Sequence, residues 1–519
     1  MCSSDLEWLE LWADSHPDKV FIKSVDQDQV VSFRDVHETA KRIAVFLAQR
    51  DIKPNDRVVL LSGNSIEHLL VYYGVMYYGA TICTVHVEIA GTVLETILRQ
   101  LKPDLMLFEQ GVPDSVKEFP CERMPLGRWA ADLEEGSFFS ELSRIESPAS
   151  APGPVNNPDD FAVIFYTSGT TELPKGVPFT FRDLEQNVEE ISEAFGIGSS
   201  DVVLEYRSLN WMSAQTISAL GALCRGAQLV LARKFSRSRF FNWIADHAVT
   251  IAVGNPTVIS MLNSSPVELP NGKSRTLRFM TSSSAPLLLQ DWRMFEEIYG
   301  IPIMQGYGSS ETGWISACSE DACKLGTVGR PLPQQALRVV DEKGAPVASG
   351  EVGFVEVGNG QDVAFRYIGD DGEPVAHAFG RYRTGDLGFL DSEGYLTLTG
   401  RQKEIIIRGG VNISPVEIDN VLLQLDGISE AAVVGVPDPI YGEEVEAFVV
   451  LSPGSTLTAE AVLAHCSERL PRQKVPKCIH FLDELPRTDR GKLDRRGLAD
   501  PSQTQVASSG GADKVQLTS

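Results

Sequence analysis

Residues 166–176, YTSGTTELPKG, combine the residue types that a phosphate-binding loop needs. Small residues and two glycines let the backbone turn tightly, so that amides and hydroxyls converge on one anion, and Lys175 adds a positive charge. The segment is not a Walker A loop, because Pro174-Lys175-Gly176 stands where that loop requires Gly-Lys-Ser/Thr. A loop of purely structural role explains the same residues, and this segment alone leaves both interpretations open.

Four further segments carry residues that could do chemistry: QGYGSSETG (305–313), YRTGDLG (382–388), GRQKEIIIRGGVNISPVEID (400–419) and LPRTDRGKLDRRGL (485–498). Tyr307 offers a flat face for stacking, and Glu311 is a hard oxygen ligand suited to Mg²⁺. Asp386 can accept two hydrogen bonds through its two oxygens. Taken singly, each has a plainer explanation: a core aromatic, a solvated charge, or a turn.

The five segments together, in this order, resemble the motifs of the adenylate-forming superfamily, which includes acyl-CoA synthetases, adenylation domains of peptide synthetases, and luciferases. The resemblance runs from the N-terminal region to about residue 498. It implies an ATP-dependent carboxylic acid–CoA ligase that releases AMP. In the first half-reaction a carboxylate and ATP give acyl-AMP and pyrophosphate, and in the second a thiol takes the acyl group.

The resemblance also assigns roles to individual residues. Tyr307 would stack on adenine, Glu311 would bind Mg²⁺, and Ser310, where relatives commonly have Thr, would reach the α-phosphate. Asp386 and Arg401 would hold the ribose. The remaining nucleotide-binding residues implied are Thr167, Ser168, Gly169, Thr170, Thr171, Lys175, Ser284 and Gly308.

Lys492 occupies the position of the family's catalytic lysine, acting together with Glu311 and Thr171. Attack on the α-phosphate builds negative charge there, and a cation aimed at that point stabilises it. The family places its hinge at Lys403, about which the small domain rotates between the two half-reactions. That rotation would bring the turn Arg408-Gly409-Gly410 toward the pantetheine arm of CoA and exclude water from the intermediate.

The acyl pocket implied by the family is lined by Trp211, Asn255, Ser283, Gly308 and Trp314. Gly308 leaves room for more than an acetyl group, whereas the serines at 283 and 284 replace glycines usual in relatives. We expect a short-to-medium acid with a polar, aromatic or cationic tail, which two indoles could enclose. Motif spacing is also similar, more loosely, to that of carnitine and crotonobetaine CoA ligases. Core packing explains both tryptophans equally well.

Three alternatives stay open. The acyl group could pass to a carrier-protein thiol instead of CoA, although only a polar tail follows residue 498. A non-catalytic adenine-nucleotide-binding regulator would be expected to lack Lys492 or Glu311, and both are present. A luciferase-type oxygenase would share every motif.

These residues must be positioned by α/β architecture. Segments 56–63, 64–79 and 80–85 predict a strand, a helix and a strand, and the pattern recurs at 202–206 to 227–234 and at 241–256. We expect a large multi-lobed N-terminal domain with helix-covered parallel or mixed sheets over residues 1–400. A hinge at 401–403, a small mobile α+β domain at 404–498 and a polar, disordered tail at 499–519 complete the prediction.

The charge composition of the chain excludes some classes of binding partner. The 519 residues include 46 Lys and Arg against 70 Asp and Glu, a net charge of −24, which opposes binding to nucleic acid or anionic membranes. No 20-residue apolar span and no signal-peptide pattern is present, so we expect a cytoplasmic protein. The eight cysteines form no CxxC pair and are expected to stay reduced. The expected partners are a small carboxylic acid, ATP and CoA, with a homodimer as one possible assembly.

Overall fold

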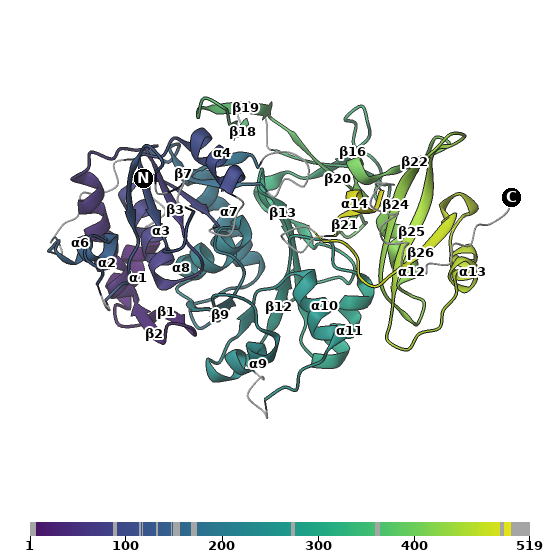
Figure 1. Ribbon diagram of the computed structural model, residues 1–519, viewed down its shortest axis with the longest axis horizontal. Helices are drawn as coiled ribbons and strands as arrows, with labels where there is room; N and C mark the ends of the chain where they lie inside the picture. Colours follow the sequence, from purple (N-terminus) through teal and green to yellow (C-terminus); the bar gives the residue numbers. More distant parts are fainter. Residues whose placement is uncertain are drawn as a thin grey trace.

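The computed structural model describes residues 7–86, 91–113, 116, 118–130, 133–146, 148, 156–167, 174–270, 276–358, 364–487 and 493–499. Figure 1 shows a large body with a smaller C-terminal unit at one end. The predicted α/β class, with a large N-terminal and a small C-terminal domain, is confirmed. Within the described ranges, no helix combines the length and the apolar character that crossing a bilayer requires.

The first sheet has six strands, and its centre is parallel because helices connect successive strands. In spatial order they are β6 (Glu122–Pro125), β5 (Leu105–Phe108), β3 (Arg57–Leu61), β4 (Thr81–Val85), β7 (Phe161–Tyr166) and β8 (Gly176–Thr180). The last pair, β7 and β8, is antiparallel. The hairpin connection between them is the segment predicted to bind phosphate.

The helix after β3 is buried along its whole length. Helix α3 (Ile66–Tyr78) begins at Ser65, whose side chain accepts from the His68 amide, and ends at Gly79 in the left-handed region. Helix α2 (Phe33–Ala48) packs so closely on it that a Cβ at Gly74 would lie 2.4 Å from the Ile43 side chain. Helix α3 therefore lies inside the large domain, where its polar residues Glu67 and His68 are buried as well.

The second sheet has nine strands and carries the repeated βα pattern of the sequence. Its order is β15 (Arg330–Pro331), β14 (Gly313–Ala317), β13 (Ile303–Ser309), β12 (Phe279–Ser282), β11 (Ile251–Ala252), β9 (Val202–Glu205), β10 (Gln228–Leu231), β1 (Val20–Ser24) and β2 (Gln29–Ser32). The run from β10 to β13 is parallel. One continuous apolar core joins this sheet to the first.

The helix that lies between the predicted strands at 202–206 and 227–234 has an unexpected geometry. It starts as a π-helix, Ala214–Leu220, and continues as α8 (Gly221–Arg225). The apolar stretch 216–232 is thus a core helix leading into β10. The wider π turn places Ser218 against Glu205, and sequence periodicity does not distinguish it from an α-helix.

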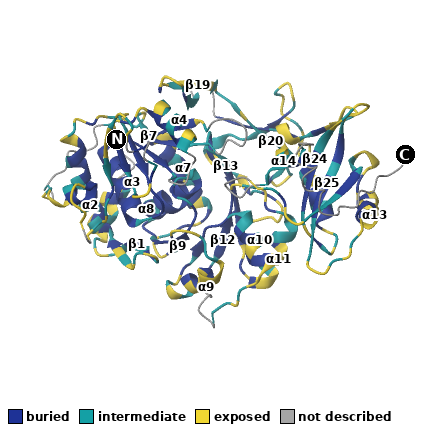
Figure 2. Ribbon diagram, in the orientation of Figure 1, coloured by how far each residue is buried: buried dark blue, intermediate teal, exposed yellow. Residues whose placement is uncertain are grey.

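A four-stranded antiparallel sheet and a separate hairpin follow. The sheet consists of β16 (Arg338–Val340), β17 (Gly353–Val357), β20 (Tyr382–Leu390) and β21 (Leu396–Arg401), and the hairpin of β18 (Ala364–Ile368) and β19 (Pro374–Phe379). The remaining helices of the large body are α1 (Glu7–Ser15), α4 (Gly91–Leu101), α6 (Phe138–Ser143), α7 (Phe181–Ala194), α9 (Arg237–Asp246), α10 (Pro256–Ser264) and α11 (Leu289–Tyr299). Figure 2 shows buried strands at the centre and exposed outer helix faces.

The C-terminal unit has its own sheet and its own apolar core. Its strands are β23 (Val411–Ile413), β22 (Ile406–Arg408), β25 (Gly442–Leu451) and β24 (Ile428–Asp438), with β26 (Cys478–Leu482) parallel to β25. Helices α12 (Pro415–Leu422) and α13 (Ala459–Arg469) contribute to this core, and α14 (Arg495–Ala499) packs near β24. The mixture of helices and strands in this unit agrees with the α+β class predicted for it.

Candidate active site

The phosphate-loop segment is the connection of the β7–β8 hairpin. Its base is closed by two hydrogen bonds: the Thr167 amide donates to the Lys175 carbonyl at 3.0 Å, and the Lys175 amide donates to Thr167 Oγ1 at 3.0 Å. The predicted residues Ser168, Gly169, Thr170 and Thr171 lie outside the described residues, as do Lys492 and the tail from residue 500. Their roles stay predictions.

The aromatic ring of Tyr367 lies between Lys175 and the predicted metal ligand, Glu311. Its Nζ is 5.4 Å from the centroid of the Tyr367 ring, and the Tyr367 hydroxyl donates to Glu311 Oε1 at 3.2 Å. Burial, together with the Glu311 charge, raises the pKa of Tyr367. Tyr367 belongs to β18 and lies in none of the five motifs, so its place between Lys175 and Glu311 could not be predicted from the motifs.

Tyr307, Asp386 and Arg401 form a second connected group. The Tyr307 hydroxyl donates to Asp386 Oδ2 at 2.6 Å, and Arg401 Nε lies 3.1 Å from Asp386 Oδ1. The Asp386 side chain is 9% exposed, whereas that of Arg401 is 62% exposed. Burial and the neighbouring carboxylate raise the pKa of Tyr307, so its hydroxyl stays protonated. In this group the Asp386 carboxylate is buried, whereas the Arg401 guanidinium is exposed to solvent.

Strand register explains how residues from distant motifs meet. Asp386 of β20 pairs directly with Arg401 of β21, which places their side chains on one face. Gly308 of β13 lies against β14, where a Cβ would come 2.3 Å from the Gly313 carbonyl oxygen. The missing side chain at Gly308 is therefore required by strand contact, a reason that the pocket argument from sequence did not include.

Ser310 and Glu311 lie in the turn between β13 and β14, and both are partly buried. The turn is tied by a 3.0 Å hydrogen bond between Ser309 Oγ and Thr312 Oγ1. Among the described residues no cluster of three or more His, Cys, Asp or Glu side chains could hold a metal by itself. A carboxylate such as Glu311 suits Mg²⁺ that is otherwise held by water and nucleotide phosphates.

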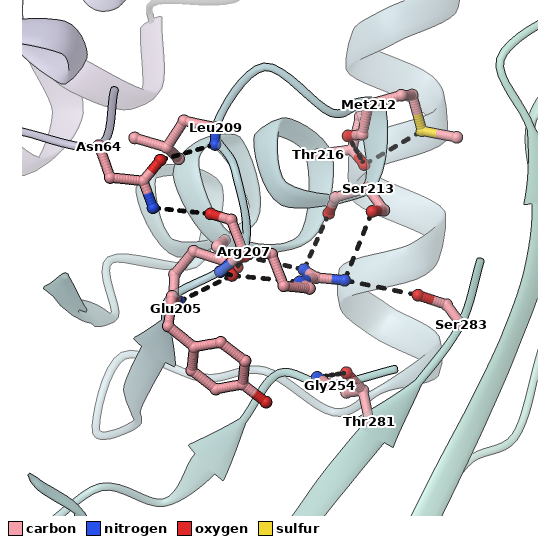
Figure 3. A network of polar contacts seen from close by, with 12 residues as sticks. Asn64, Glu205, Arg207, Leu209, Met212, Ser213, Thr216, Gly254, Thr281 and Ser283 are labelled. Carbon is pink, nitrogen blue, oxygen red and sulfur yellow. Dashed lines mark hydrogen bonds and ion pairs between the residues drawn. The ribbon is translucent and has the colours of Figure 1, made fainter. Parts of the chain in front are cut away.

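A buried ion pair, which we call the sealed pair, lies beside the predicted acyl pocket (Figure 3). Arg207 Nη2 lies 2.8 Å from Glu205 Oε2, and its Nε lies 3.1 Å from Glu205 Oε1. Glu205 also accepts from Ser218, and Arg207 Nη1 lies 3.4 Å from the hydroxyls of Ser213 and Ser283. The predicted pocket residue Ser283 is thus fixed by Arg207, although no motif indicated that pair.

The other predicted pocket residues separate into two groups. Trp211 and Asn255 line a cavity, and the Asn255 side chain caps α10 by accepting from the Val258 amide. Trp314 is 1% exposed, and its Nε1 donates to Thr216 Oγ1 at 2.8 Å. Core packing therefore explains Trp314, while Trp211 is available at a cavity wall.

Ser284 adopts φ of +75°, a backbone region that favours glycine. The side chain is exposed, beyond the end of β12. This conformation gives a physical reason for the glycine that relatives usually have at this position. A non-glycine residue held there is strained, which is typical of loops at functional sites.

The predicted CoA turn joins β22 to β23. Arg408 pairs with Val411 across a two-residue turn in which Gly409 and Gly410 both have positive φ, so glycine suits both positions. The Arg408 guanidinium is held by Glu444 at 2.7 Å and by the Gln473 carbonyl at 2.8 Å. Arg408 thus stiffens the turn, and the glycine backbone is the part left exposed.

Lys403 is exposed in a short 3₁₀ helix, Gln402–Glu404. The strand before it belongs to the four-stranded sheet, and the strand after it belongs to the C-terminal sheet. A single exposed turn between two sheets is where a rotation can be absorbed with little loss of packing.

Two family models match the chain. The AMP-binding enzyme model covers residues 9–367, and the AMP-binding enzyme C-terminal domain model covers residues 417–492. The chain is 32% identical to a sulfoacetate–CoA ligase of Cupriavidus necator over 492 residues, 93% of this chain and 94% of the relative. It is also 32% identical to an oxalate–CoA ligase of Arabidopsis thaliana over 505 residues, 95% and 97% of the two chains.

Solved structures agree with the sequence matches. ATP-bound MatB from Rhodopseudomonas palustris superposes with a TM-score of 0.85 and 26% identity, covering 96% of this chain and 99% of MatB. An anthranilate–CoA ligase, AuaEII, in complex with anthranoyl-AMP has the same fold, with a TM-score of 0.85 and coverage of 98% of both chains. The chain therefore belongs to the AMP-binding enzyme family and is an acid–thiol ligase of that family.

Proposed function

We propose that this enzyme is an AMP-forming carboxylic acid–CoA ligase for a short-to-medium acid with a polar or aromatic tail. The observation that supports it most is the meeting of residues from four distant motifs. Lys175 and Glu311 meet around Tyr367, and Tyr307 is joined to Asp386 and Arg401. These are the charges and hydrogen-bonding groups that a Mg²⁺-nucleotide and a ribose require.

The first step is an in-line displacement on ATP. A carboxylate oxygen of the acid forms a bond to the α-phosphorus, the bond from that phosphorus to the bridging oxygen breaks, and pyrophosphate leaves. In the proposal Lys492 stabilises the charge that develops on the α-phosphate, while Asp386 and Arg401 hold the ribose. Mg²⁺ bound near Glu311 would neutralise phosphate charge.

The second step transfers the acyl group to sulfur. The CoA thiolate attacks the acyl carbon, the bond to the phosphate oxygen breaks, and AMP leaves. No nucleophile on the protein is needed, because a thiol of ordinary pKa near 8.5 already has a thiolate fraction at neutral pH. A turn about Lys403 would exchange Lys492 for the Gly409–Gly410 backbone at the site.

Two observations support the proposed class of carboxylic acid: the substrates for which relatives are named, and the aromatic residue that lines the cavity. Relatives named for sulfoacetate, oxalate and indoleacetate act on small polar or aromatic acids. In this chain one indole, Trp211, lines a cavity, whereas Trp314 lies in the core. One aromatic wall favours a compact acid over enclosure of a cation between two indoles. CoA is favoured as acceptor over a carrier-protein thiol because these relatives are CoA ligases.

The test is pyrophosphate release over a panel of carboxylic acids, with and without CoA. We expect release with small polar or aryl acids, and AMP formation that depends on CoA. Activity confined to acids of twelve or more carbons would contradict the acid class. Absence of nucleotide cleavage with every acid, while ATP still binds, would favour a regulator.

The role of Lys492 is tested by separating the two steps. Lys492→Ala should abolish adenylate formation but retain thioester formation from supplied acyl-AMP. Exposed Lys343 provides the matched control, since Lys343→Ala removes the same charge away from the described site residues. Equal loss of both steps in Lys492→Ala would contradict the assignment.

A further inference from the structure

Two cysteines lie opposite one another across a tight turn that follows β14. Ser319 and Ala322 form an isolated antiparallel bridge, in which the Ser319 amide donates to the Ala322 carbonyl at 3.3 Å and the Ala322 amide donates to the Ser319 carbonyl at 3.1 Å. The turn between them is formed by residues 320–321. Cys318 and Cys323 are the next pair outward, so the register of the bridge places them opposite each other.

The geometry of this position suits a disulfide. Ser319 and Ala322 exchange both backbone hydrogen bonds, so the two cysteines occupy the neighbouring non-hydrogen-bonded position. Opposed Cα atoms are about 4.5 Å apart there, with both side chains on one face, and a disulfide spans Cα separations of about 4.4–6.8 Å. Both thiols are free, and their side chains are hydrogen-bonded to each other. The backbone is therefore arranged for a bond between these two sulfurs.

The cysteine pair contacts the strand that leads into the predicted nucleotide site. The Cys318 amide donates to the Gln305 carbonyl at 2.8 Å, and Cys323 Sγ lies 3.5 Å from the Ile303 carbonyl oxygen. Both carbonyls belong to β13. On the other side of Cys318, the chain at Gly329 packs so closely that a Cβ there would collide with the Cys318 amide nitrogen. Cys318 is thus fixed in place, and Cys323 is the partner that can adjust.

The two thiols differ in exposure and in acidity. Cys318 is fully buried, whereas Cys323 is exposed. The hydrogen bond from Cys323 lowers the pKa of the Cys318 thiol below its ordinary value, although burial acts in the opposite direction, and the same hydrogen bond raises the pKa of Cys323. Burial instead raises the pKa of Cys121 and of Cys466 to about 11. Since the thiolate is the reactive form, the pair is more reactive than these two thiols.

We propose that Cys318 and Cys323 are a redox modification site, which a low-molecular-weight disulfide converts into a reversible intrachain disulfide. The site is independent of the proposed ligase activity. It departs from the prediction that all cysteines stay reduced, because a spacing of five residues does not reveal the turn that places these two opposite each other. An intrachain bond is favoured over a lasting mixed disulfide, since the second thiol is already held against the first.

The reaction proceeds by two exchanges. With glutathione disulfide, the sulfur of exposed Cys323 attacks one glutathione sulfur, its proton passes to the Cys318 thiolate along their hydrogen bond, and the first glutathione leaves as a thiolate. The Cys318 sulfur then attacks the Cys323 sulfur, and the second glutathione leaves with the Cys318 proton. The two protein thiols lose two electrons in total, and glutathione disulfide gains them as it becomes two glutathione molecules.

Thiol trapping on the full, folded chain tests this site without requiring turnover. The enzyme is equilibrated in buffers of increasing glutathione disulfide, the remaining free thiols are alkylated, and linked peptides are identified by mass spectrometry. The variants are Cys318→Ser and Cys323→Ser. Cys121→Ser is the matched control, since it removes a partly exposed thiol outside the pair.

The unmodified enzyme and Cys121→Ser should both form a link between Cys318 and Cys323 that dithiothreitol removes. In the unmodified enzyme this link should appear at a glutathione disulfide concentration about 10-fold or more below that needed for a mixed disulfide on Cys121. Cys318→Ser should stop at a mixed disulfide on Cys323. Cys323→Ser should form no link, and because it changes an exposed residue it tests the site even where Cys318→Ser does not fold.

A bond that fits the native structure should also raise the melting temperature of the oxidised enzyme by about 2–4 °C, and the same treatment should not raise that of Cys323→Ser. Two outcomes would overturn the proposal: a folded enzyme that keeps both thiols unlinked at glutathione disulfide concentrations that modify Cys121, and a link that forms only after unfolding in denaturant. Neither measurement uses ATP, an acid or CoA, so failure of the ligase proposal would leave this result unchanged.

Discussion

Two arginine–carboxylate pairs in this enzyme have the same chemistry and opposite surroundings. Glu205 and Arg207 are sealed in the large domain, with two contacts between them and further hydrogen bonds to Ser213, Ser218 and Ser283. Asp386 and Arg401 share one 3.1 Å contact, and the Arg401 side chain is 62% exposed.

This difference indicates a structural role for the buried pair and a role in ligand binding for the exposed pair. A buried pair whose groups are all satisfied cannot exchange partners without leaving a charge unpaired, so it fixes the surrounding loops. An open pair in which one member faces solvent can exchange one contact for a ligand at little cost. We therefore expect changes at the sealed pair to alter stability, and changes at the open pair to alter nucleotide binding.

The largest expected effect comes from breaking the sealed pair. Glu205→Gln leaves the Arg207 charge buried without a counter-ion and should lower the free energy of unfolding by about 3–5 kcal/mol. Denaturant unfolding measures it. The matched control is Asp18→Asn, which breaks the exposed pair with Arg34 and should change stability by less than about 0.5 kcal/mol. Similar small losses in both variants would remove the distinction between the pairs.

A substitution in the exposed pair, Asp386–Arg401, should alter nucleotide binding more than stability. Asp386→Asn keeps the shape but removes the charge that would accept the ribose hydroxyls, so KM for ATP should rise about 100-fold. The melting temperature should change little. Asp391→Asn, at the end of the same hairpin and paired with Lys324, is the control for nucleotide affinity. A large loss of stability with unchanged KM would place Asp386 with the sealed pair.

The stability of the large domain should also depend on pH, because the buried helix α3 contains His68. Burial lowers the pKa of His68 to about 3, below its ordinary value of 6.5, and its Nδ1 lies 2.7 Å from Ser62 Oγ. Between these two values the unfolded chain binds a proton that the folded chain does not, so stability falls as pH falls. From pH 6.5 to 5.0 this group should remove about 2 kcal/mol.

Denaturant unfolding at several pH values checks that slope. His68→Asn should flatten the slope over this interval, while His16→Asn, at an exposed histidine, should leave it unchanged. If the His68→Asn slope equals that of the unmodified enzyme, His68 is not buried in its neutral form.

The smallest effect concerns the hydroxyl that joins Tyr307 to Asp386. Tyr307→Phe keeps the ring for stacking and removes the 2.6 Å hydrogen bond, so KM for ATP should rise about fivefold, near 1 kcal/mol. In an Asp386→Asn background the same change should have a smaller effect, because the two groups act together. Fully additive effects would show that the hydrogen bond is not coupled to nucleotide binding.

Much of this arrangement could be predicted from sequence. Apolar runs and helical spacing predicted β3, α3 and β4 within one or two residues, because their local pattern and tertiary environment agree. The motifs alone indicated Lys175, Tyr307, Glu311 and Asp386 as candidate site residues. Tyr367 lies in no motif, and its contacts with Lys175 and Glu311 join residues far apart in the chain. Glu205 and Arg207 are only two residues apart, but the contacts with Ser218 and Ser283 that complete their network come from other elements.

The α/β class, the order of the motifs and the chemistry that those residue types allow could all be read from the amino-acid sequence, because periodicity and side-chain types are local properties. Which motifs meet depends on the fold. Strand register set Asp386 opposite Arg401, and the β18 hairpin brought Tyr367 between Lys175 and Glu311. Folding also gathered Arg207, Arg233 and Lys234 into one cavity of an acidic protein, because neighbouring parallel strands end at a common edge.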